Sequence, residues 1–512
     1  MTGAAATTTQ NRMANLKTLF KDTALYGMSS IVGRFLNYLL VPLYTAKIAA
    51  SSGGYGVITN VYAYTALLLV ILTFGMETTF FRFVNKEGAH PMRTYSTVLI
   101  MVGTVAATFV ALVALFLTPI SNFMGYSAHH DYVMIMSACV AIDAFQCIPF
   151  AYLRYKHRPW KFVALKMLFI VMNIGLNLLY FIVLPAMYSN PSTHSAAAAI
   201  YDPSVGVGYV FRLNLFCTGI ITFFFYRELT GFRWVFDRRL ARRMLSYSWP
   251  ILLLGITGIL NQTADKILYP IVSPGAEGHV QLGIYGAAAK IAMIMAMITQ
   301  AFRYAYEPFV FGSAKEKGSR DTYAKAMKYF IIFTLLAYLV VVGYLDVLKY
   351  IIGRDYWPGL KVVPIVMAAE IMMGVYFNLS FWYKLIDKTI YGAWFSGVGC
   401  VVLIAINIIF IPRYGYMACA WAGVAGYGTA MLLSYFVGQK EYPINYPLKS
   451  IGVYVAIAAL FTTIMLLMPH TLPTLVRLGV NTVLIILFVA HIVHYDFPLA
   501  SLPVVGKWFA RR

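Results

Sequence analysis

The chain has 512 residues, of which 60% are hydrophobic and only 12% are charged. Soluble domains carry about 25% charged residues, so the composition excludes an ordinary soluble protein and indicates a polytopic membrane protein. The net charge of +21 does not indicate a nucleic-acid partner, because most Lys and Arg residues lie in short loops between apolar segments, where membrane proteins carry them anyway.

Apolar segments long enough to cross the hydrocarbon as helices recur along the chain after a polar start at 1–22. They predict an all-α membrane protein with fourteen transmembrane helices. A first lobe at 23–228 holds six of them, at 23–46, 57–83, 95–118, 130–153, 163–184 and 207–227. A basic linker at 229–244 leads to a second lobe of six at 245–438, with helices at 245–271, 283–311, 326–347, 362–383, 391–412 and 416–438. The last part, 439–512, contains helices at 450–468 and 474–494 and a tail.

The basic residues fall mainly on alternate loops and so predict the topology. No Lys or Arg occurs in the loops 119–129, 185–206 and 272–282, whereas the loops between them are basic, most of all 227–243. The exceptions to this alternation are Lys47, Arg413 and the loop 348–361. Because cytoplasmic loops carry the excess of Lys and Arg, we expect both termini in the cytoplasm.

The sequence shows no pattern typical of an enzyme or a metal site. Its five cysteines lie within or at the ends of apolar segments without metal-ligand spacing, and they are Cys139, Cys147, Cys217, Cys400 and Cys419. We expect them to be small buried hydrophobes. No nucleophile–base pair, metal cluster or phosphate-binding glycine loop accompanies them, so the sequence predicts neither catalysis nor a cofactor.

The same residue types recur along the two predicted lobes at an offset of 230 or 228 residues. The recurring pairs are Tyr55 and Tyr285, Glu77 and Glu307, Asn177 and Asn407, and Tyr95 and Tyr323. This agreement predicts two homologous six-helix lobes followed by two extra helices. Six is an even number, so both lobes enter the membrane in the same direction. We expect a parallel pseudo-two-fold arrangement, as in transporters that rock two halves around a central site.

Three stretches resemble polysaccharide flippases of the multidrug/oligosaccharidyl-lipid/polysaccharide (MOP) exporter superfamily, of the O-antigen type. They are LKTLFKDTALYGMSSIVGRFLNYLLVPLYT at 16–45, YGVITNVYAYTALLLVILTFGMETTFFRF at 55–83 and INIIFIPRYGYMACAWAGVAGYGTAMLLSY at 406–435. The resemblance implies a bacterial cytoplasmic-membrane protein that moves undecaprenyl-pyrophosphate-linked oligosaccharide outward by alternating access. It implies H⁺ or Na⁺ as the coupling ion and no other cofactor. Membrane lipid and the polysaccharide polymerase machinery would be its partners. In the related lipid II flippases, the two extra helices form a groove for the lipid tail.

Arginines inside the membrane are the candidate ligands of the pyrophosphate head group. Arg34 lies near the middle of the first predicted helix, and Arg303 lies within the eighth, nearer its cytoplasmic end. The fork geometry of a guanidinium suits a pyrophosphate, and the resemblance implies cavity-lining arginines on these two helices. The alternative is that each arginine pairs with a buried acid for packing, and Glu307 is close enough to occupy Arg303.

Two acids near the middle of predicted spans are candidates for ion coupling. Asp143 and Glu370 fall within one residue of equivalence in the repeat. On a lipid-facing surface each would cost about 2.5–3.5 kcal/mol by insertion scales, so we expect both to face the interior. They could bind a proton, act as counter-charges to the arginines, or only join helices by hydrogen bonds.

Asp265 and Asn407 are weaker candidates for coupling, through sodium. The resemblance implies a sodium site between helices 7, 11 and 12 in some relatives, where these two residue types would correspond. The acid that some relatives carry one turn after the asparagine would fall at Ile411. Asp265 is also followed directly by Lys266, with which it could form a local neutral pair.

Glu77 and Glu307 are candidate gate residues near the cytoplasmic ends of helices 2 and 8. Arg303 and Glu307 are four residues apart and can pair on one face of their helix. Glu77 and Arg82 are five apart, about 140° around a helix, and cannot easily meet. We therefore expect the partner of Glu77 on another helix or a cytoplasmic loop. That pair would either close the inward mouth or anchor its lobe permanently.

Other functions fit the sequence less well. A drug/cation antiporter of the same superfamily has twelve spans as a rule and takes cationic cargo. A polymerase or ligase needs reactive groups on a large outward loop, and the longest such loop, 185–206, offers little beyond His194 and Asp202. A scaffold does not explain charges in mid-membrane. A lipid II flippase would share the architecture and differ in cargo.

Overall fold

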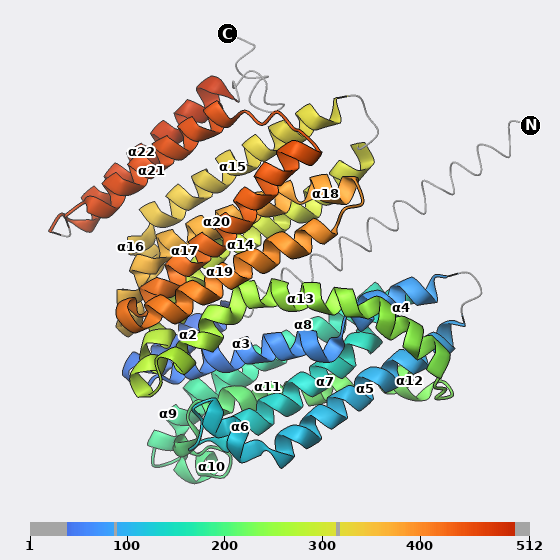
Figure 1. The fold of residues 1–512 in the computed structure, drawn as a ribbon. Helices are drawn as coiled ribbons and strands as arrows, with labels where there is room; N and C mark the ends of the chain where they lie inside the picture. The colour runs from blue at the N-terminus through green and yellow to red at the C-terminus, as the bar shows by residue number, and fades with distance from the viewer. Residues whose placement is uncertain (1–37, 87–89, 314–317, 470, 497–512) are drawn as a thin grey trace, which may run out of the picture. The chain divides into compact units, whose positions relative to one another are not determined.

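The computed structural model describes residues 38–86, 90–313, 318–469 and 471–496, and this part of the chain is helical, with no β-strand. The predicted all-α fold class is therefore confirmed. Contacts divide the chain into two compact units, Met1–Gly283 (unit 1) and Ile284–Arg512 (unit 2). Figure 1 shows the helices of each unit along the chain.

Most of the predicted membrane spans are present. Twelve helices in the described residues are long and apolar enough to cross a membrane, and the shorter apolar helix Gly208–Phe223 matches the predicted span 207–227. Together they account for every predicted span except the first. That span, 23–46, lies largely outside the described residues, so the predicted total of fourteen is not confirmed.

Unit 1 contains the helices of the first predicted lobe and one more long helix. Pro91 and Pro159 stand at the first positions of two helices, where a missing N–H costs nothing. The helices are α2 (Leu40–Lys47), α3 (Gly54–Thr73), α4 (Met76–Val84), α5 (Pro91–Leu115), α6 (Leu117–Phe123), α7 (His130–Tyr155), α8 (Pro159–Leu178), α9 (Leu184–Ser189), α10 (His194–Ala198), α11 (Gly208–Phe223), α12 (Tyr226–Thr230), α13 (Arg238–Val272) and the start of α14 (Ala276–Ser313).

The single helix predicted at 57–83 is interrupted between α3 and α4. Phe74 and Gly75 both have positive φ, at 50° and 65°. Glycine adopts this conformation readily, whereas phenylalanine does not, so the break is imposed on Phe74 by its surroundings. As a result, Glu77 lies in the first turn of α4 instead of deep within a continuous helix.

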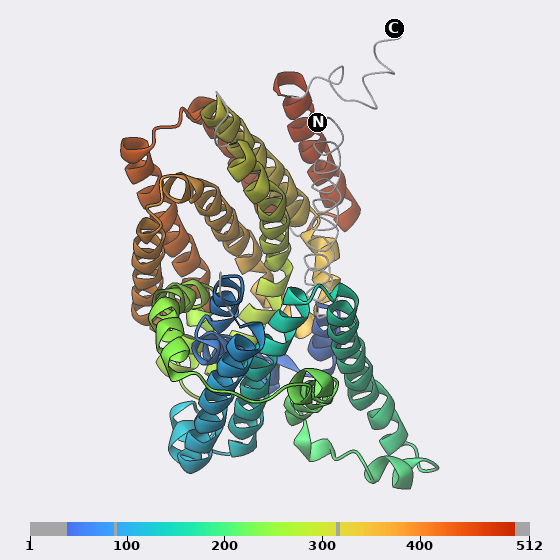
Figure 2. The same ribbon diagram turned by 90° about the vertical axis from the view of Figure 1, so that its right-hand side faces the viewer.

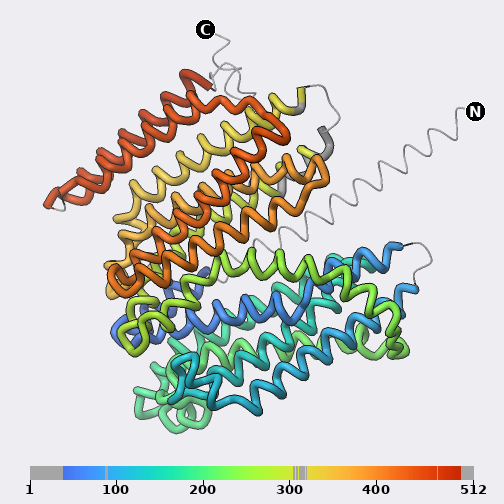
Figure 3. The backbone as a smooth tube through the Cα atoms, in the orientation of Figure 1, coloured from blue at the N-terminus to red at the C-terminus, as the bar shows by residue number. Residues whose placement is uncertain are grey.

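Helix α13 packs along α3, and this places it in unit 1. Asn60 of α3 donates a hydrogen bond from Nδ2 to the backbone oxygen of Lys266 in α13, at 2.7 Å. Pro250 lies inside α13, and the tube in Figure 3 shows that the helix is bent. The predicted lobe boundary was the basic linker at 229–244, whereas unit 1 extends past α13 to Gly283.

Gly56, which follows the repeated Tyr55, is required by close packing in unit 1. A Cβ atom at Gly56 would overlap the carbonyl oxygen of His279, and it would lie 3.0 Å from the backbone nitrogen of Gly283. Only glycine lets the start of α3 cross the start of α14 this closely.

Unit 2 contains the remaining helices, and its last two pack against α15. Figure 1 shows this pair beside α15, at the end of the chain. The helices are α15 (Ser319–Gly343), α16 (Leu345–Leu348), α17 (Val363–Leu379), α18 (Phe381–Leu385), α19 (Ile390–Tyr414), α20 (Tyr416–Glu441), α21 (Leu448–Leu467) and α22 (Thr474–Tyr495), with a 3₁₀ segment at Arg354–Val362. Phe330, Tyr454 and Phe488 fill the core between α15, α21 and α22.

Corresponding helices pack in the same way within each unit. Helix α5 packs on α7 and α7 on α11 in unit 1, as α15 packs on α17 and α17 on α20 in unit 2. Asn177 and Asn407 are both fully buried, and each donates to the backbone oxygen four residues earlier, at 2.8 Å. The sequence repeat therefore corresponds to a repeat in structure.

Candidate substrate and coupling sites

Two of the predicted site residues cannot be located. Arg34 lies outside the described residues. The side chain of Glu307 also lies outside them, although its backbone belongs to α14. The roles of both residues stay predictions.

Arg303 faces a pocket within unit 2. Its guanidinium lies 4.8 Å from the ring centre of Phe377 in α17. The pocket is formed by α14, α15, α17 and α18 and is lined by Thr299, Phe302, Arg303, Phe330, Gly374, Phe377, Asn378 and Phe381. An exposed guanidinium at the edge of an aromatic pocket can meet an anionic group and still be held by the ring face.

Asp143 lies in α7 near a cation that the sequence analysis did not single out. Its carboxylate accepts a hydrogen bond from Thr218 Oγ1 at 3.4 Å and interacts electrostatically with Lys166 of α8. The Lys166 ammonium lies 4.0 Å above the ring centre of Phe150. Unit 1 therefore holds an acid and a base on two different helices, α7 and α8, and the two side chains attract each other electrostatically.

A chain of polar groups connects Asp143 to α3. Asn214 Nδ2 donates to Tyr62 Oη at 2.8 Å, and Cys139 Sγ donates to Asn214 Oδ1 at 3.0 Å. Thr218 Oγ1 lies 3.7 Å from the same sulfur and donates to Asp143. These contacts join α3, α7 and α11 through side-chain polar groups next to Asp143. Cys139 is thus more than a buried hydrophobe.

All five cysteines are free thiols, four of them buried and Cys147 half-buried. The described residues contain no cluster of three or more His, Cys, Asp or Glu side chains that could hold a metal ion.

Glu370 lies in α17, half-buried, in the unit that also holds Arg303. Lys290, in the apolar part of α14, is also half-buried and was missed by the sequence analysis, as Lys166 was. Both lysines follow short apolar runs, and a lysine in such a run carries the same insertion cost that singled out the acids. Applying that criterion to bases would have found them.

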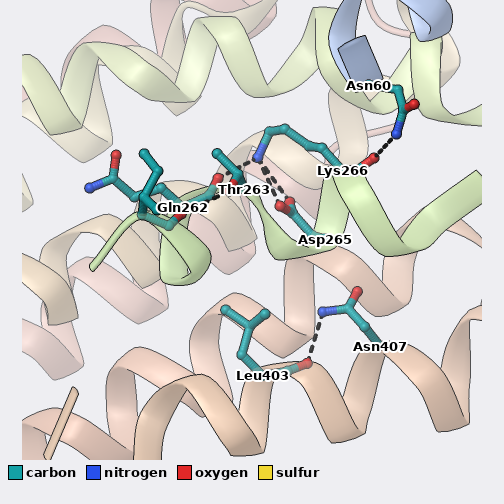
Figure 4. Close-up of polar contacts among 8 residues, drawn as sticks. Asn60, Gln262, Thr263, Asp265, Lys266, Leu403 and Asn407 are labelled. Carbon is teal, nitrogen blue, oxygen red and sulfur yellow. Dashed lines mark hydrogen bonds and ion pairs between the residues drawn. The ribbon is translucent and has the colours of Figure 1, made fainter. Parts of the chain in front are cut away.

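The carboxylate of Asp265 forms an ion pair with the next residue in the chain, Lys266. Lys266 Nζ lies 3.0 Å from each carboxylate oxygen of Asp265 and also donates to the backbone oxygen of Gln262 at 2.9 Å, as Figure 4 shows. The Asp265 side chain is only 10% exposed. A sodium ion at this carboxylate would therefore have to displace an ammonium.

Asn407, the other residue proposed for sodium, is fully buried in unit 2. Its Nδ2 donates to Leu403 O at 2.8 Å, drawn separately in Figure 4. This bond is internal to α19, and its repeat equivalent in α8 is the same, so it is a feature of the fold as much as of any site.

Glu77 pairs with Arg154 at the end of α7. The guanidinium also lies 5.0 Å from the ring centre of Phe81. Sequence reasoning placed the partner on another helix or a loop without identifying it. Both residues belong to unit 1, and an ion pair within one unit favours the anchor over the gate, because a gate has to join parts that separate.

Comparisons with known proteins were made for sequence and for fold. The family model described as "Polysaccharide biosynthesis protein" matches residues 19–305. No curated protein matches the sequence significantly.

Solved structures show the same fold. A lipid II flippase, MurJ, in an inward closed conformation has a TM-score of 0.70 and 14% identity, covering 92% of this chain and 99% of that one. An inward-facing multidrug resistance MATE transporter of the MOP superfamily has a TM-score of 0.60 and 14% identity, covering 79% and 93%. The structure of the MATE multidrug transporter DinF-BH has a TM-score of 0.56 and 14% identity, covering 82% of this chain and 95% of that one.

Proposed function

Because the chain belongs to the polysaccharide biosynthesis protein family and has the fold of MOP-superfamily exporters, we propose that it is a flippase for a lipid-linked oligosaccharide. Its cargo would be an undecaprenyl-pyrophosphate-linked repeat unit of O-antigen, capsule or exopolysaccharide. The cargo would move from the cytoplasmic to the outer leaflet of the bacterial cytoplasmic membrane by alternating access. Both termini would lie in the cytoplasm.

The extent of the fold similarity carries this proposal. The lipid II flippase structure covers 92% of the chain, whereas the two MATE structures cover 79% and 82%. The chain also has α21 and α22 after its two six-helix repeats, and these favour a lipid-linked cargo over a soluble drug. A polysaccharide polymerase acting on the delivered repeat unit would be the natural partner.

The sign of the embedded charges supports an anionic cargo. Arg303 is exposed at the edge of its aromatic pocket, where its charge would attract an anionic head group and repel a cationic drug. A pyrophosphate needs such cations, because it cannot enter hydrocarbon without compensation. Arg34, at its predicted depth, would be a further cation for the head group.

Among coupling ions, we favour the proton. Asp143 accepts one long hydrogen bond, from Thr218 at 3.4 Å, whereas both carboxylate oxygens of Asp265 contact Lys266 at 3.0 Å. Glu370 would be a second protonatable group, in unit 2. Sodium at Asp265 and Asn407 is the alternative.

Deleting the gene tests the function. We expect the surface polysaccharide to be lost and its lipid-linked repeat unit to accumulate, protected from reagents added outside the cell. Complementation with wild type and with Lys325→Ala, an exposed residue at the start of α15, should restore the polysaccharide, whereas Arg303→Ala should not. Normal surface polysaccharide in the deletion strain would refute the proposal. Arrested peptidoglycan synthesis would indicate lipid II as cargo, and altered drug resistance alone would indicate an antiporter.

A further inference from the structure

The basic linker is an ordered part of unit 1. Figure 2 shows the green segment between α12 and α13 crossing one end of this unit. Ser96 Oγ of α5 accepts a hydrogen bond from the Val235 backbone N–H at 2.7 Å, and Thr97 Oγ1 accepts one from the Asp237 N–H at 3.2 Å. The backbone of the segment is therefore held in place by side chains of α5.

The two acids of the segment 226–243 are already used within the protein. Glu228 is buried and pairs with Lys161 of α8 at 2.6 Å. Asp237 pairs with Arg93 at 3.2 Å and accepts a hydrogen bond from the Leu240 N–H at 3.0 Å, which caps the start of α13. Neither acid is left to neutralise the arginines of the segment.

The arginines of the segment point outward. There are six of them, all exposed, and no ion pair is formed by any of them within the described part of the chain; they are Arg227, Arg233, Arg238, Arg239, Arg242 and Arg243. On α13, Leu240, Ala241 and Met244 are buried on the opposite side. One face of the first turns of α13 is therefore cationic and the other packs into unit 1.

Large apolar side chains are exposed among these arginines. Trp234 and Phe236 are each 51% exposed, and Trp249 is 54% exposed. Arg242 and Trp249 are seven residues apart, which places them on one stripe of the helix about 10 Å apart along its axis. At a membrane interface, arginine side chains contact the lipid phosphates, and tryptophan rings lie slightly closer to the hydrocarbon. The spacing of Arg242 and Trp249 along the helix matches this order.

We propose that this basic belt, residues 226–243, binds the head groups of anionic phospholipids, such as phosphatidylglycerol or cardiolipin, in the cytoplasmic leaflet. The guanidinium groups would contact the phosphates, while Trp234 and Phe236 would enter the interface. The positive-inside rule requires only that Lys and Arg residues lie on the cytoplasmic side of the membrane. It does not explain why the backbone of the belt is held by α5, why both of its acids are paired, or why aromatic side chains are exposed between its arginines.

Lipid retention by the purified full chain tests the proposal without reference to cargo. Native mass spectrometry would measure binding of phosphatidylglycerol, cardiolipin and phosphatidylcholine to wild type and to the triple variant Arg239→Gln/Arg242→Gln/Arg243→Gln. We expect the variant to bind both anionic lipids about tenfold more weakly, since each basic residue near an anionic surface contributes to attraction. Its binding of phosphatidylcholine should not change.

A matched control removes the same charge elsewhere. Lys325, Lys440 and Lys449 are exposed lysines of unit 2 on the predicted cytoplasmic side, and their triple substitution by Gln should leave anionic lipid binding near wild type. Equal losses in the two triple variants, or none in either, would overturn the proposal. Inorganic pyrophosphate is added as a competitor. Displacement of phosphatidylglycerol by pyrophosphate, but not by sulfate at equal ionic strength, would indicate a cargo site and also overturn it.

A second variant keeps every charge and therefore the topology. Trp234→Ala/Phe236→Ala should weaken binding of anionic lipid several-fold, because the interfacial contribution of the aromatic rings is lost. Unchanged binding in this variant would show that the belt does not enter the interface, and would refute the proposal as stated.

Discussion

The ion pairs that join α22 to the rest of unit 2 give a quantitative test of the structure. Asp346 of α16 lies 2.9 Å from Arg477 of α22 and 3.2 Å from Lys349. The side chains of Asp346 and Arg477 are each only 15% exposed. Replacing Asp346 by Asn keeps the shape and removes the charge, which leaves two cations facing each other without their shared anion.

The expected cost follows from burial. Breaking a fully buried pair costs about 3–5 kcal/mol, and these groups are mostly but not fully buried, so we expect a loss of about 2–3 kcal/mol. For a domain the size of unit 2, this lowers Tm by about 4–12 °C. Glu77→Gln is the internal comparison, because Glu77 is 43% exposed and Arg154 30%. An exposed pair contributes about 1 kcal/mol or less, so its Tm should fall by no more than about 4 °C.

Thermal unfolding of the purified variants in detergent measures both effects, and hydrogen exchange locates them. For Asp346→Asn, exchange should increase first in α22, since Arg477 is its link to α16. A double-mutant cycle with Arg477→Gln should show that the two losses are not additive. Equal melting of Asp346→Asn and Glu77→Gln, or additive losses in the cycle, would refute the assignment of Asp346 as an anchor.

The same Glu77→Gln protein distinguishes the two roles of that residue. An anchor predicts the small loss of stability above with unchanged labelling of a cysteine placed deep on the cytoplasmic side. A gate predicts normal stability and faster labelling. The location of both partners in unit 1 leads us to expect the first result.

Three further predictions concern transport and pH. Asp143→Asn should abolish the response of transport to a proton gradient, and an unaltered response would remove the Asp143–Lys166 pair from coupling. Arg303→Ala should abolish surface polysaccharide at normal protein abundance, and Arg303→Lys should restore little of it because a point charge replaces a fork. Hydrogen bonding from Leu240, with Arg93 nearby, lowers the pKa of Asp237, so its contribution to stability is complete above about pH 4 and is lost as pH falls through the lowered value. Melting curves of Asp237→Asn should therefore converge with those of wild type as the pH falls below the ordinary carboxyl pKa, and a constant gap would contradict this.

The sequence predicted the helices well because hydrophobicity and charge act locally. The span predicted at 130–153 is α7, His130–Tyr155, and the span predicted at 474–494 is α22, Thr474–Tyr495. Their ends coincide with the first polar or charged residues, which the bilayer would exclude. The break at Gly75 was missed because one glycine in an apolar run is compatible with a continuous helix, and the close approach of Ile251 in α13 to Gly75 appears only in the folded chain.

Partners of charged residues could not be predicted, because they depend on tertiary contacts. The sequence showed that Glu77 needs a partner, but Arg154 is distant in the chain and lies just beyond the predicted span 130–153. Similarly, 229–244 was predicted as a linker from its charge, whereas its order comes from Ser96 and Thr97. The amino-acid composition gives the sign of the charge of a segment, but only the fold shows which side chains hold its backbone in place.

The repeat shows where the two halves of the chain have diverged. Part of their framework is the same, since Asn177 and Asn407 each donate to the backbone oxygen four residues earlier, in α8 and α19. At the offset of 230 that relates these asparagines, Lys166 corresponds to Ser396, and Arg303 corresponds to Thr73.

Lys166 and Arg303 are therefore each present in one half and replaced by a small hydroxyl in the other, whereas Lys290 corresponds to Asn60 at the same offset. Thr73 bonds only within its own helix, donating to Leu69 O at 2.8 Å. Duplication alone would have produced equal charges in the two halves. The retained asymmetry is what a transporter needs if one half responds to the coupling ion and the other meets the anionic cargo. Under the proposed function, the proton would act through Asp143 and Lys166 in unit 1, and Arg303 would contribute the cargo contact from unit 2.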